Sequence, residues 1–105
     1  MPTERVEITR ARQEVALNPD GVVVTGVTSV IARARNEFRH HLYLINDSVN
    51  IIYLSKSDTA VSGQGIVLVD RGSTFECGTD TDDPYTGPIA AIASAAASNL
   101  VFSEA

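Results

Sequence analysis

The sequence predicts an all-β fold, a small antiparallel β-sandwich or barrel with an extended N-terminal arm. Short runs rich in Val, Ile, Thr and aromatic residues recur along the chain, separated by Gly, Pro, Asn or Asp residues. These turn signals come about every ten residues, as in sandwiches and barrels. The strongest pattern, residues 41–55, has two β-branched and aromatic runs joined by a polar break, which is typical of a β-hairpin.

The size and composition indicate one folded domain. Single domains most often have about 100 to 150 residues, and this chain has 105. Its apolar fraction of 44% is ordinary for a folded protein, so disorder of the whole chain is not expected. A domain of this size buries only about two-thirds of the surface of its unfolded chain, so burial through oligomerisation would help. We divide the chain into an arm, residues 1–20, and a β-sandwich domain, residues 21–105.

The arm has no strong hydrophobic period. Two alternating runs, residues 6–8 and 15–17, suggest short exposed or edge strands, whereas residues 9–14 would equally suit a helical turn. An extended arm that becomes ordered against a partner fits this pattern. The sequence Asn-Pro-Asp-Gly at residues 18–21 predicts a turn at the start of the domain.

Two strands are predicted before the hairpin and four after it. Residues 22–25 and 27–34 are rich in Val, Ile and Thr, with Gly26 as a bulge or break between them. The short apolar run 66–69 is typical of a strand buried on both sides, and a turn at Asp70-Arg71-Gly72 would join it to 73–77 in a second hairpin. Alanines in residues 89–97 favour a helix, yet we interpret them as a strand because the closing run 99–103 needs a partner.

The register of the central hairpin predicts apolar residues on both of its faces. With the turn between Ser48 and Val49, Ile45 faces Ile52 and Tyr43 faces Leu54 on one side. Leu44 and Tyr53 then pair on the other side. Each such side chain stabilises the fold by about 1.5 to 3 kcal/mol when fully buried. Both faces therefore need cover from the rest of the chain or from a neighbouring subunit.

The charge is unevenly distributed along the chain, whose net charge is −5. Residues 1–41 hold six arginines against five carboxylates, and residues 42–105 hold two basic residues against eight acidic ones. The halves form two solvated surfaces, or attract one another between subunits, or the arginines meet an acidic partner. An acidic body argues against nucleic-acid binding. No run approaches the about 18 apolar residues of a membrane span, so we expect no membrane partner.

No motif predicts catalysis, a cofactor or a bound metal. His40 and His41 would point to opposite faces of a strand, so they are poorly placed to chelate one metal. The acidic loop 80–83 could bind Ca²⁺ through Asp80, Asp82 and Asp83, but it lacks the spacing of an EF-hand, and a solvated loop is favoured. The single cysteine, Cys77, excludes an intramolecular disulfide and has no evident base partner, so we expect a small core residue. Phosphate-binding glycine loops and nucleophile elbows are also missing, so an enzyme is not expected.

Four motifs follow one another in the last part of the chain. They are Arg-x2-Leu-x-Leu-x-Asn-x-Ser from Arg39, Ile-Tyr-Leu from Ile52, Gly-Ile-x-Leu-x-x-x-Gly from Gly65, and Tyr-Thr-Gly-Pro-Ile-x-Ala-Ile-Ala from Tyr85; a short strand and Glu104 follow. Together they resemble the small β-sandwich virion proteins of tailed bacteriophages, which are encoded among head and tail structural genes. The resemblance covers residues 39–55 and 63–104, and the motif from Tyr85 is its most specific part.

The resemblance implies a non-enzymatic structural protein of the virion, assembled in the host cytoplasm. Within that class we favour a head decoration or cement protein that binds the major capsid protein or other virion proteins and its own copies, with a trimer favoured. The alternatives are a tail, neck or head-fibre component, or a carbohydrate-binding β-sandwich module, for which Tyr85 is the only loop tyrosine. The expected partner-binding residues are Arg5, Arg10 and Arg12 of the arm and Tyr43 and Tyr53 of the hairpin.

Overall fold

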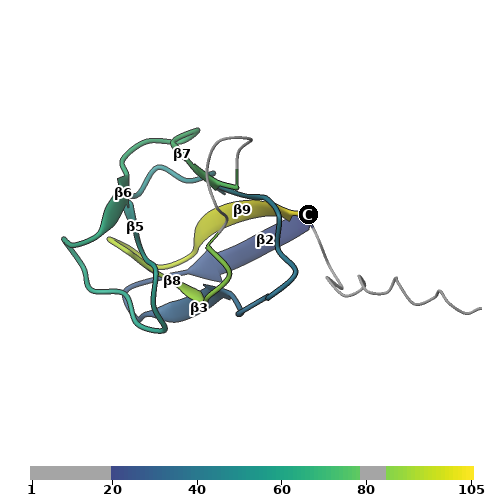
Figure 1. The fold of residues 1–105 in the computed structure, drawn as a ribbon. Coiled ribbons are helices and arrows are strands. Elements are labelled where there is room, and N and C mark those ends of the chain that lie inside the picture. Colours follow the sequence, from purple (N-terminus) through teal and green to yellow (C-terminus); the bar gives the residue numbers. More distant parts are fainter. Residues whose placement is uncertain (1–19, 79–84) are drawn as a thin grey trace, which may run out of the picture.

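The computed structural model describes residues 20–78 and 85–105. In these residues eight strands form two antiparallel sheets, which confirms the predicted β-sandwich (Figure 1). The first sheet has the order β2 (Asp20–Thr25), β9 (Ser98–Glu104), β4 (Leu42–Asn46) and β7 (Thr74–Cys77). The second has the order β3 (Val30–Arg33), β8 (Ile89–Ala93), β5 (Ile52–Ser55) and β6 (Ile66–Leu68). The described part of the chain contains no helix that could span a membrane.

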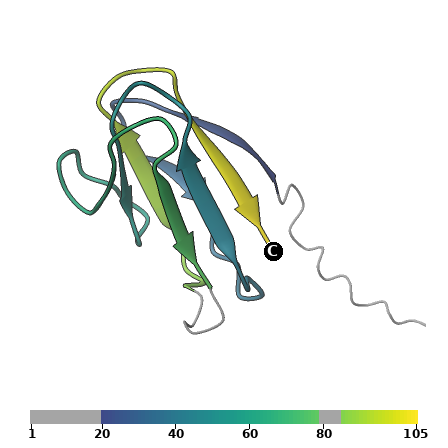
Figure 2. The same cartoon turned by 90° about the horizontal axis from the view of Figure 1, so that it is seen from above.

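The core lies between the two sheets. Seen from above, β7, β4, β9 and β2 lie side by side in one layer (Figure 2). Side chains alternate between the faces of a strand, and every second residue of β4, β5 and β9 points inward. The inner residues that these strands bury are Leu42, Leu44, Ile52, Leu54, Leu100 and Phe102. Strand β8 is buried on both faces, and its alanines leave room for close packing on each side.

The predicted central hairpin is wrong. Strand β4 pairs with β9 and β7, whereas β5 pairs with β8 and β6 in the other sheet. The expected pairs Ile45–Ile52, Tyr43–Leu54 and Leu44–Tyr53 therefore do not form. Residues 47–51, the predicted turn region, instead carry the chain across from one sheet to the other, so that both strands turn their aliphatic residues towards one core.

The predicted second hairpin is wrong for the same reason. Strands β6 and β7 belong to different sheets, although the turn between them exists: the Ser73 amide donates to the Asp70 carbonyl at 3.0 Å. Nor is β6 buried on both sides, because Val67 and the following Val69 are exposed. As an edge strand β6 has a partner on one side only. Local turn signals do not tell in which sheet the next strand will lie.

The first and last strands pair with each other. Asp20 and Gly21, expected in a turn, are extended in β2 and pair with Ser103 and Phe102 of β9. The missing side chain of Gly21 leaves room for Phe102, since a Cβ on Gly21 would lie 2.8 Å from the Phe102 ring. The predicted break at Gly26 is confirmed, because β2 ends there and the chain crosses to β3.

The predicted strand at residues 89–97 is confirmed over its first part, as β8. Its expected partner was the closing strand, and that pairing is wrong. Strand β8 lies between β3 and β5, while the closing strand β9 lies between β2 and β4. The two are consecutive in the chain but cross from one sheet to the other, as β4 and β5 do.

Gly63 and Gly65, in the loop between β5 and β6, have similar backbone conformations but different surroundings. Their φ angles are 84° and 88°, in the region that L side chains rarely adopt. A Cβ on Gly65 would collide with the Leu54 carbonyl oxygen, whereas Gly63 has open space. We expect Gly63→Ala to cost about 1 kcal/mol from backbone strain, and Gly65→Ala at least about 2 kcal/mol because the clash adds to it. Urea unfolding of both variants checks this; equal losses would contradict the close approach at Gly65.

Candidate functional site

An apolar strip crosses the outer face of the first sheet. Val101 of β9 lies between Val22 of β2 and Ile45 of β4 in the strand register. Residues that pair across antiparallel strands share a face, so these three side chains form a row, with Val24 and Tyr43 on the same face beside it. Val22 and Val24 are 56% and 61% exposed, and the other three are half-buried. We call these five residues the outer strip.

Polar side chains lie along one side of the outer strip, next to Tyr43. Glu76 of β7 pairs with Tyr43 in the register, and its carboxylate lies 2.9 Å from His41 Nε2. The His41 ring meets the Tyr43 ring edge-on, with the centroids 4.4 Å apart. These contacts orient Tyr43, one of the predicted partner-binding residues, next to a carboxylate. This side therefore offers hydrogen-bonding groups beside an apolar row.

Tyr53, the other predicted tyrosine, lies on the opposite side of the molecule. It belongs to the outer face of the second sheet, where it packs against Ala60, Ala90 and Ile92. The Ala60 amide donates to Ser29 Oγ at 2.8 Å, which holds the loop after β5 over this face. The structure therefore does not bring Tyr43 and Tyr53 together. Their strands share the core, and both tyrosines point away from it.

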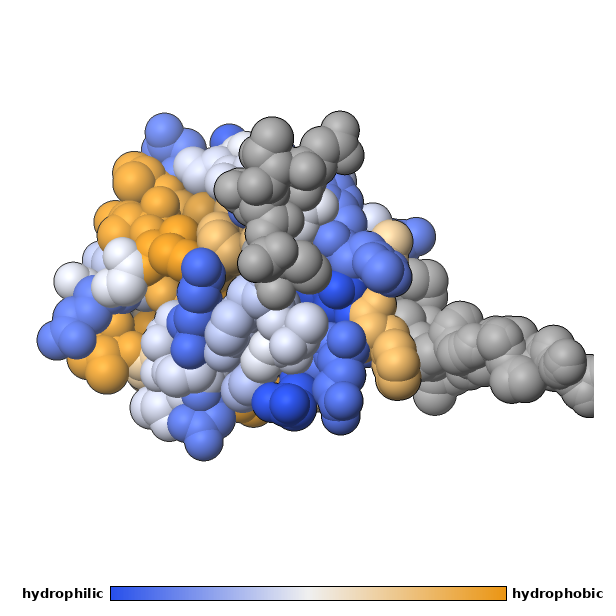
Figure 3. Space-filling view, in the orientation of Figure 1, coloured by the Kyte–Doolittle hydropathy of each residue, from blue (hydrophilic) through white to orange (hydrophobic). Residues whose placement is uncertain are grey.

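A further apolar area lies at the edge strand β6. On the face shown in Figure 3, hydrophobic surface gathers on the side where Figure 1 labels β6, away from the C-terminus. Exposed Val67 and Val69 belong to this edge. Strand β6 itself has three residues, so this area lies at a short sheet edge, whereas the outer strip lies on the face of a sheet.

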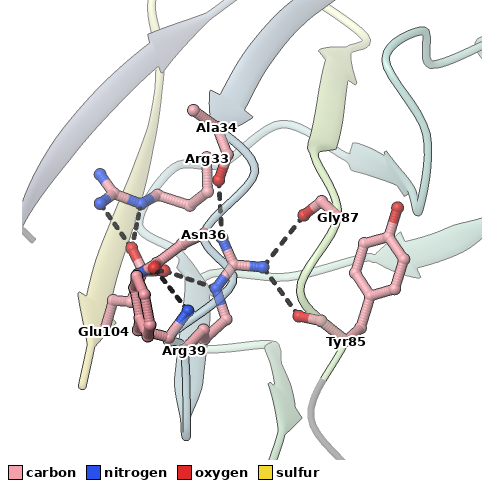
Figure 4. A network of polar contacts seen from close by, with 8 residues as sticks. Arg33, Ala34, Asn36, Arg39, Tyr85, Gly87 and Glu104 are labelled. Carbon is pink, nitrogen blue, oxygen red and sulfur yellow. Dashed lines mark hydrogen bonds and ion pairs between the residues drawn. The ribbon is translucent and has the colours of Figure 1, made fainter.

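A buried ion-pair network joins the two sheets at one end of the sandwich (Figure 4). Arg39 is buried and donates through Nε to the Glu104 carboxylate at the end of β9. Its Nη1 donates to the carbonyls of Tyr85 and Gly87 at 2.8 and 3.1 Å, and its Nη2 to that of Ala34 at 2.8 Å. One guanidinium thereby connects the segment after β3, the end of β9 and the entry to β8.

Glu104 accepts hydrogen bonds from three residues in this network. Besides Arg39, Arg33 donates to Oε1 through Nε and Nη2 at 2.9 and 2.5 Å, and Asn36 Nδ2 donates to Oε2 at 3.1 Å. Burial by itself raises the pKa of Glu104, but the hydrogen bonds from Arg39, Arg33 and Asn36 outweigh it and hold the pKa below its ordinary value of 4.5. The carboxylate is therefore kept ionised inside the protein.

A second polar centre is formed by Asn46, which is fully buried at the end of β4. Its Nδ2 donates to the carbonyls of Asn50 and Leu68 at 2.8 and 2.9 Å. Its Oδ1 accepts from the Ser48 amide and hydroxyl at 2.9 and 2.7 Å. All four bonds of the side chain are satisfied, and they fix the segment that crosses between the sheets.

The chain was compared with protein families, curated proteins and solved structures. No family model, curated protein or solved structure matches this chain at a significant level. The function proposed below therefore rests on the geometry of the chain and on the sequence resemblance described above.

The motif residues singled out in the sequence prove to be structural. Arg39, Asn46, Tyr85 and Glu104 all belong to the two buried networks. Sequence reasoning missed the partnership of Arg39 with Glu104, which lie 65 residues apart. The available signal was an arginine just before an alternating strand and a glutamate ending another, and neither points to the other.

Tyr85 turns inward and does not form an exposed platform. Its ring is half-buried against the core, and its hydroxyl donates to the Pro88 carbonyl at 2.9 Å. A Cβ on Gly87 would collide with the ring, so the chain turns closely around it. The Lys56 ammonium lies 5.7 Å from the ring centroid. These contacts engage part of the ring and leave Tyr85 half-buried.

Several other predicted residues can now be placed. Cys77 lies buried in the core cluster with Phe75 packed against it, which confirms the expected core role. Within residues 20–78 and 85–105, no group of three or more His, Cys, Asp or Glu side chains could hold a metal ion. The predicted partner residues Arg5, Arg10 and Arg12, and the acidic residues Asp80, Asp82 and Asp83, lie outside the described residues.

Proposed function

We propose that this protein is a non-enzymatic structural protein of a tailed-phage particle, and within that class a decoration or cement protein on the outside of the head shell. The observation that supports the proposal is the outer strip, an apolar row presented on a rigid, hydrogen-bonded sheet. The resemblance of residues 39–55 and 63–104 to phage β-sandwich virion proteins supports the assignment to a phage particle. The major capsid protein is the proposed partner.

The mechanism is burial of the outer strip against the shell. Each valine or isoleucine that becomes fully buried contributes about 1.5 to 3 kcal/mol, while association costs at least about 4 kcal/mol. Three of the five side chains are already half-buried, so binding gains much less than five full burials, and the affinity per copy is modest. Simultaneous binding of linked copies raises the effective affinity, which suits a protein arrayed on a symmetric shell. In this proposal Arg5, Arg10 and Arg12 add contacts to acidic shell surface.

The position of Tyr85 supports this choice over the carbohydrate-binding alternative. Such a module binds sugars on exposed aromatic rings, and the ring of Tyr85 is engaged by the core and by Lys56. The tail, neck and head-fibre alternatives use the same kind of apolar contact. They differ from the decoration role in copy number and position, and those can be measured.

Cryo-electron microscopy of purified particles tests the proposal. We expect hundreds of copies arrayed over the head, with the outer strip against the shell. A few copies at one vertex or along the tail would contradict the decoration role in favour of a neck, tail or fibre component. Particles that lack the protein altogether would refute the virion assignment.

Replacing Ile45 with Lys is expected to reduce the number of copies bound per particle by at least tenfold. The substitution puts a charge at the β4 end of the row, next to Val101, and a tenfold loss corresponds to about 1.4 kcal/mol. Val67→Lys is the control, since Val67 is exposed on β6 of the other sheet, away from the outer strip. Quantitative gel analysis of reconstituted particles gives the occupancy, and equal occupancy of both variants would remove the strip from the mechanism.

A further inference from the structure

One of the four sheet edges lacks the features that keep edge strands from pairing. Short length, irregular register and charged residues protect edges in natural sheets. Strand β6 has three residues, β3 has a register shift between Ile31 and Arg33, and β7 has four residues and carries Glu76. Strand β2 has six residues in unbroken register with β9, and its only charged residue is Asp20 at its start.

The outer edge of β2 is also available in the described structure. Among residues 20–78 and 85–105, no strand pairs with β2 other than β9. Asp20 and Gly21, expected in a turn, continue the strand and pair with Ser103 and Phe102. Val22 and Val24 are more than half exposed. Within the described residues, this six-residue edge is thus apolar and has a partner strand on one side only.

We propose that β2 pairs with β2 of a second copy of this chain, antiparallel and about a two-fold axis. A continuous sheet requires residues that face each other across the axis to share a face. The register centred on Val23 satisfies this condition: Val22 of one copy lies opposite Val24 of the other. Asp20 then lies opposite the uncharged Gly26, so the only charge of the strand opposes no like charge.

This arrangement is self-complementary, as a two-fold interface must be. The two four-stranded sheets become one sheet of eight strands, and the exposed edge is removed. The four valines at the axis are neighbours on the outer face, so they join the outer strips of the two copies into one apolar surface. A dimer would thereby present twice the apolar area on one face of the sheet.

A second copy is favoured over another protein because two β2 strands match in the register centred on Val23, with valines opposite valines and no like charges opposed. A strand from an unrelated protein would need a matching pattern of apolar residues, which a second copy already has. The dimer does not depend on the proposed virion role, because its argument uses only β2 and its register. A two-fold pair is an alternative to the trimer favoured in the sequence analysis.

Sedimentation equilibrium of the full-length chain tests the proposal. We expect a reversible monomer–dimer equilibrium from low micromolar concentrations upward. In the register centred on Val23, the double variant Val22→Lys, Val24→Lys opposes like charges and should weaken dimerisation by at least tenfold. The double variant Val22→Lys, Val24→Glu opposes unlike charges and should stay dimeric. The two differ at one residue, and the control Val67→Lys should dimerise like the wild type.

Mixing supplies a second readout. The Lys-Lys variant and a matching Val22→Glu, Val24→Glu variant should each be monomeric and should form a heterodimer when mixed in equal amounts. Circular dichroism confirms that each variant is folded. A wild type that is monomeric at every concentration would overturn the proposal, as would a trimer or a dimer that the Lys-Lys variant leaves intact. The particle occupancy of Ile45→Lys is measured independently, so failure of the dimer and failure of the virion role are distinguishable.

Discussion

Replacing Arg39 with Met is expected to destabilise the protein by about 3 to 5 kcal/mol, the cost of breaking a buried ion pair on one side. The variant keeps most of the volume of the side chain but leaves the Glu104 carboxylate with only its hydrogen bonds from Arg33 and Asn36. The carbonyls of Ala34, Tyr85 and Gly87 also lose their donor inside the protein, and each unsatisfied group adds to the loss. Urea unfolding monitored by circular dichroism measures the change.

Arg71→Met is the matched control for this variant. Arg71 Nε lies 3.3 Å from Asp47, but the two side chains are 63% and 55% exposed. Exposed pairs of this kind contribute at most about 1 kcal/mol. A loss at Arg39 no larger than that at Arg71 would mean that the buried network does not hold the two sheets together.

Glu104 adds a pH dependence to the same network. Because its pKa is lower in the folded protein than its ordinary value of 4.5, the folded state favours the ionised form. Its contribution to stability is complete above the ordinary pKa and is lost as the pH falls through the lowered pKa. The free energy of unfolding of the wild type should therefore fall below about pH 4.5. Glu104→Gln should lack this part of the pH dependence, and identical slopes for the two proteins would contradict the assignment.

Replacing Asn46 with Ala is expected to cost about 3 kcal/mol, because a fully buried side chain with four hydrogen bonds is removed and partners are left unsatisfied. The carbonyls of Asn50 and Leu68 lose their donor, and Ser48 loses its acceptor. Because these groups fix the segment that crosses between the sheets, the variant should also speed amide exchange in residues 47–51. Hydrogen exchange and urea unfolding together measure both effects.

Asn99→Ala is the control for Asn46. Asn99 is exposed in β9, and surface substitutions away from special features usually change stability by no more than about 0.5 kcal/mol. If Asn46→Ala were equally mild, the crossing segment would be held by its backbone alone.

The sandwich was predictable from the sequence because composition and alternation are local properties. The partner of each strand was not. In the predicted hairpin, Leu44 shares a face with Tyr53, whereas the protein turns Leu44 and Leu54 towards one core and both tyrosines outward. The five-residue crossing 47–51 lets both leucines face the core and both tyrosines face outward. A tight turn between Ser48 and Val49 would not allow this arrangement.

The outer strip could not be predicted from the sequence for the same reason. Tyr43 could be selected from its own strand, but Val22, Ile45 and Val101 become neighbours only through pairings between the beginning, middle and end of the chain. Nothing in the local pattern of any one strand indicates which others will lie beside it. The buried partnership of Arg39 with Glu104 depends on the same long-range closure.

The central position of β9 has a consequence for the order in which the protein folds. Strand β9 is the last along the chain, yet it lies between β2 and β4 and completes the first sheet. Among the described strands, only β5 and β6 pair with a neighbour in the sequence. Folds dominated by such distant pairings fold in milliseconds to seconds, because the entropy of closing long loops must be overcome first. During synthesis, β2 and the edge of β4 that faces β9 therefore stay unpaired until residues 98–104 have emerged, whereas the other edge of β4 can pair earlier with β7. A chaperone that binds apolar strands would have its substrate during that interval.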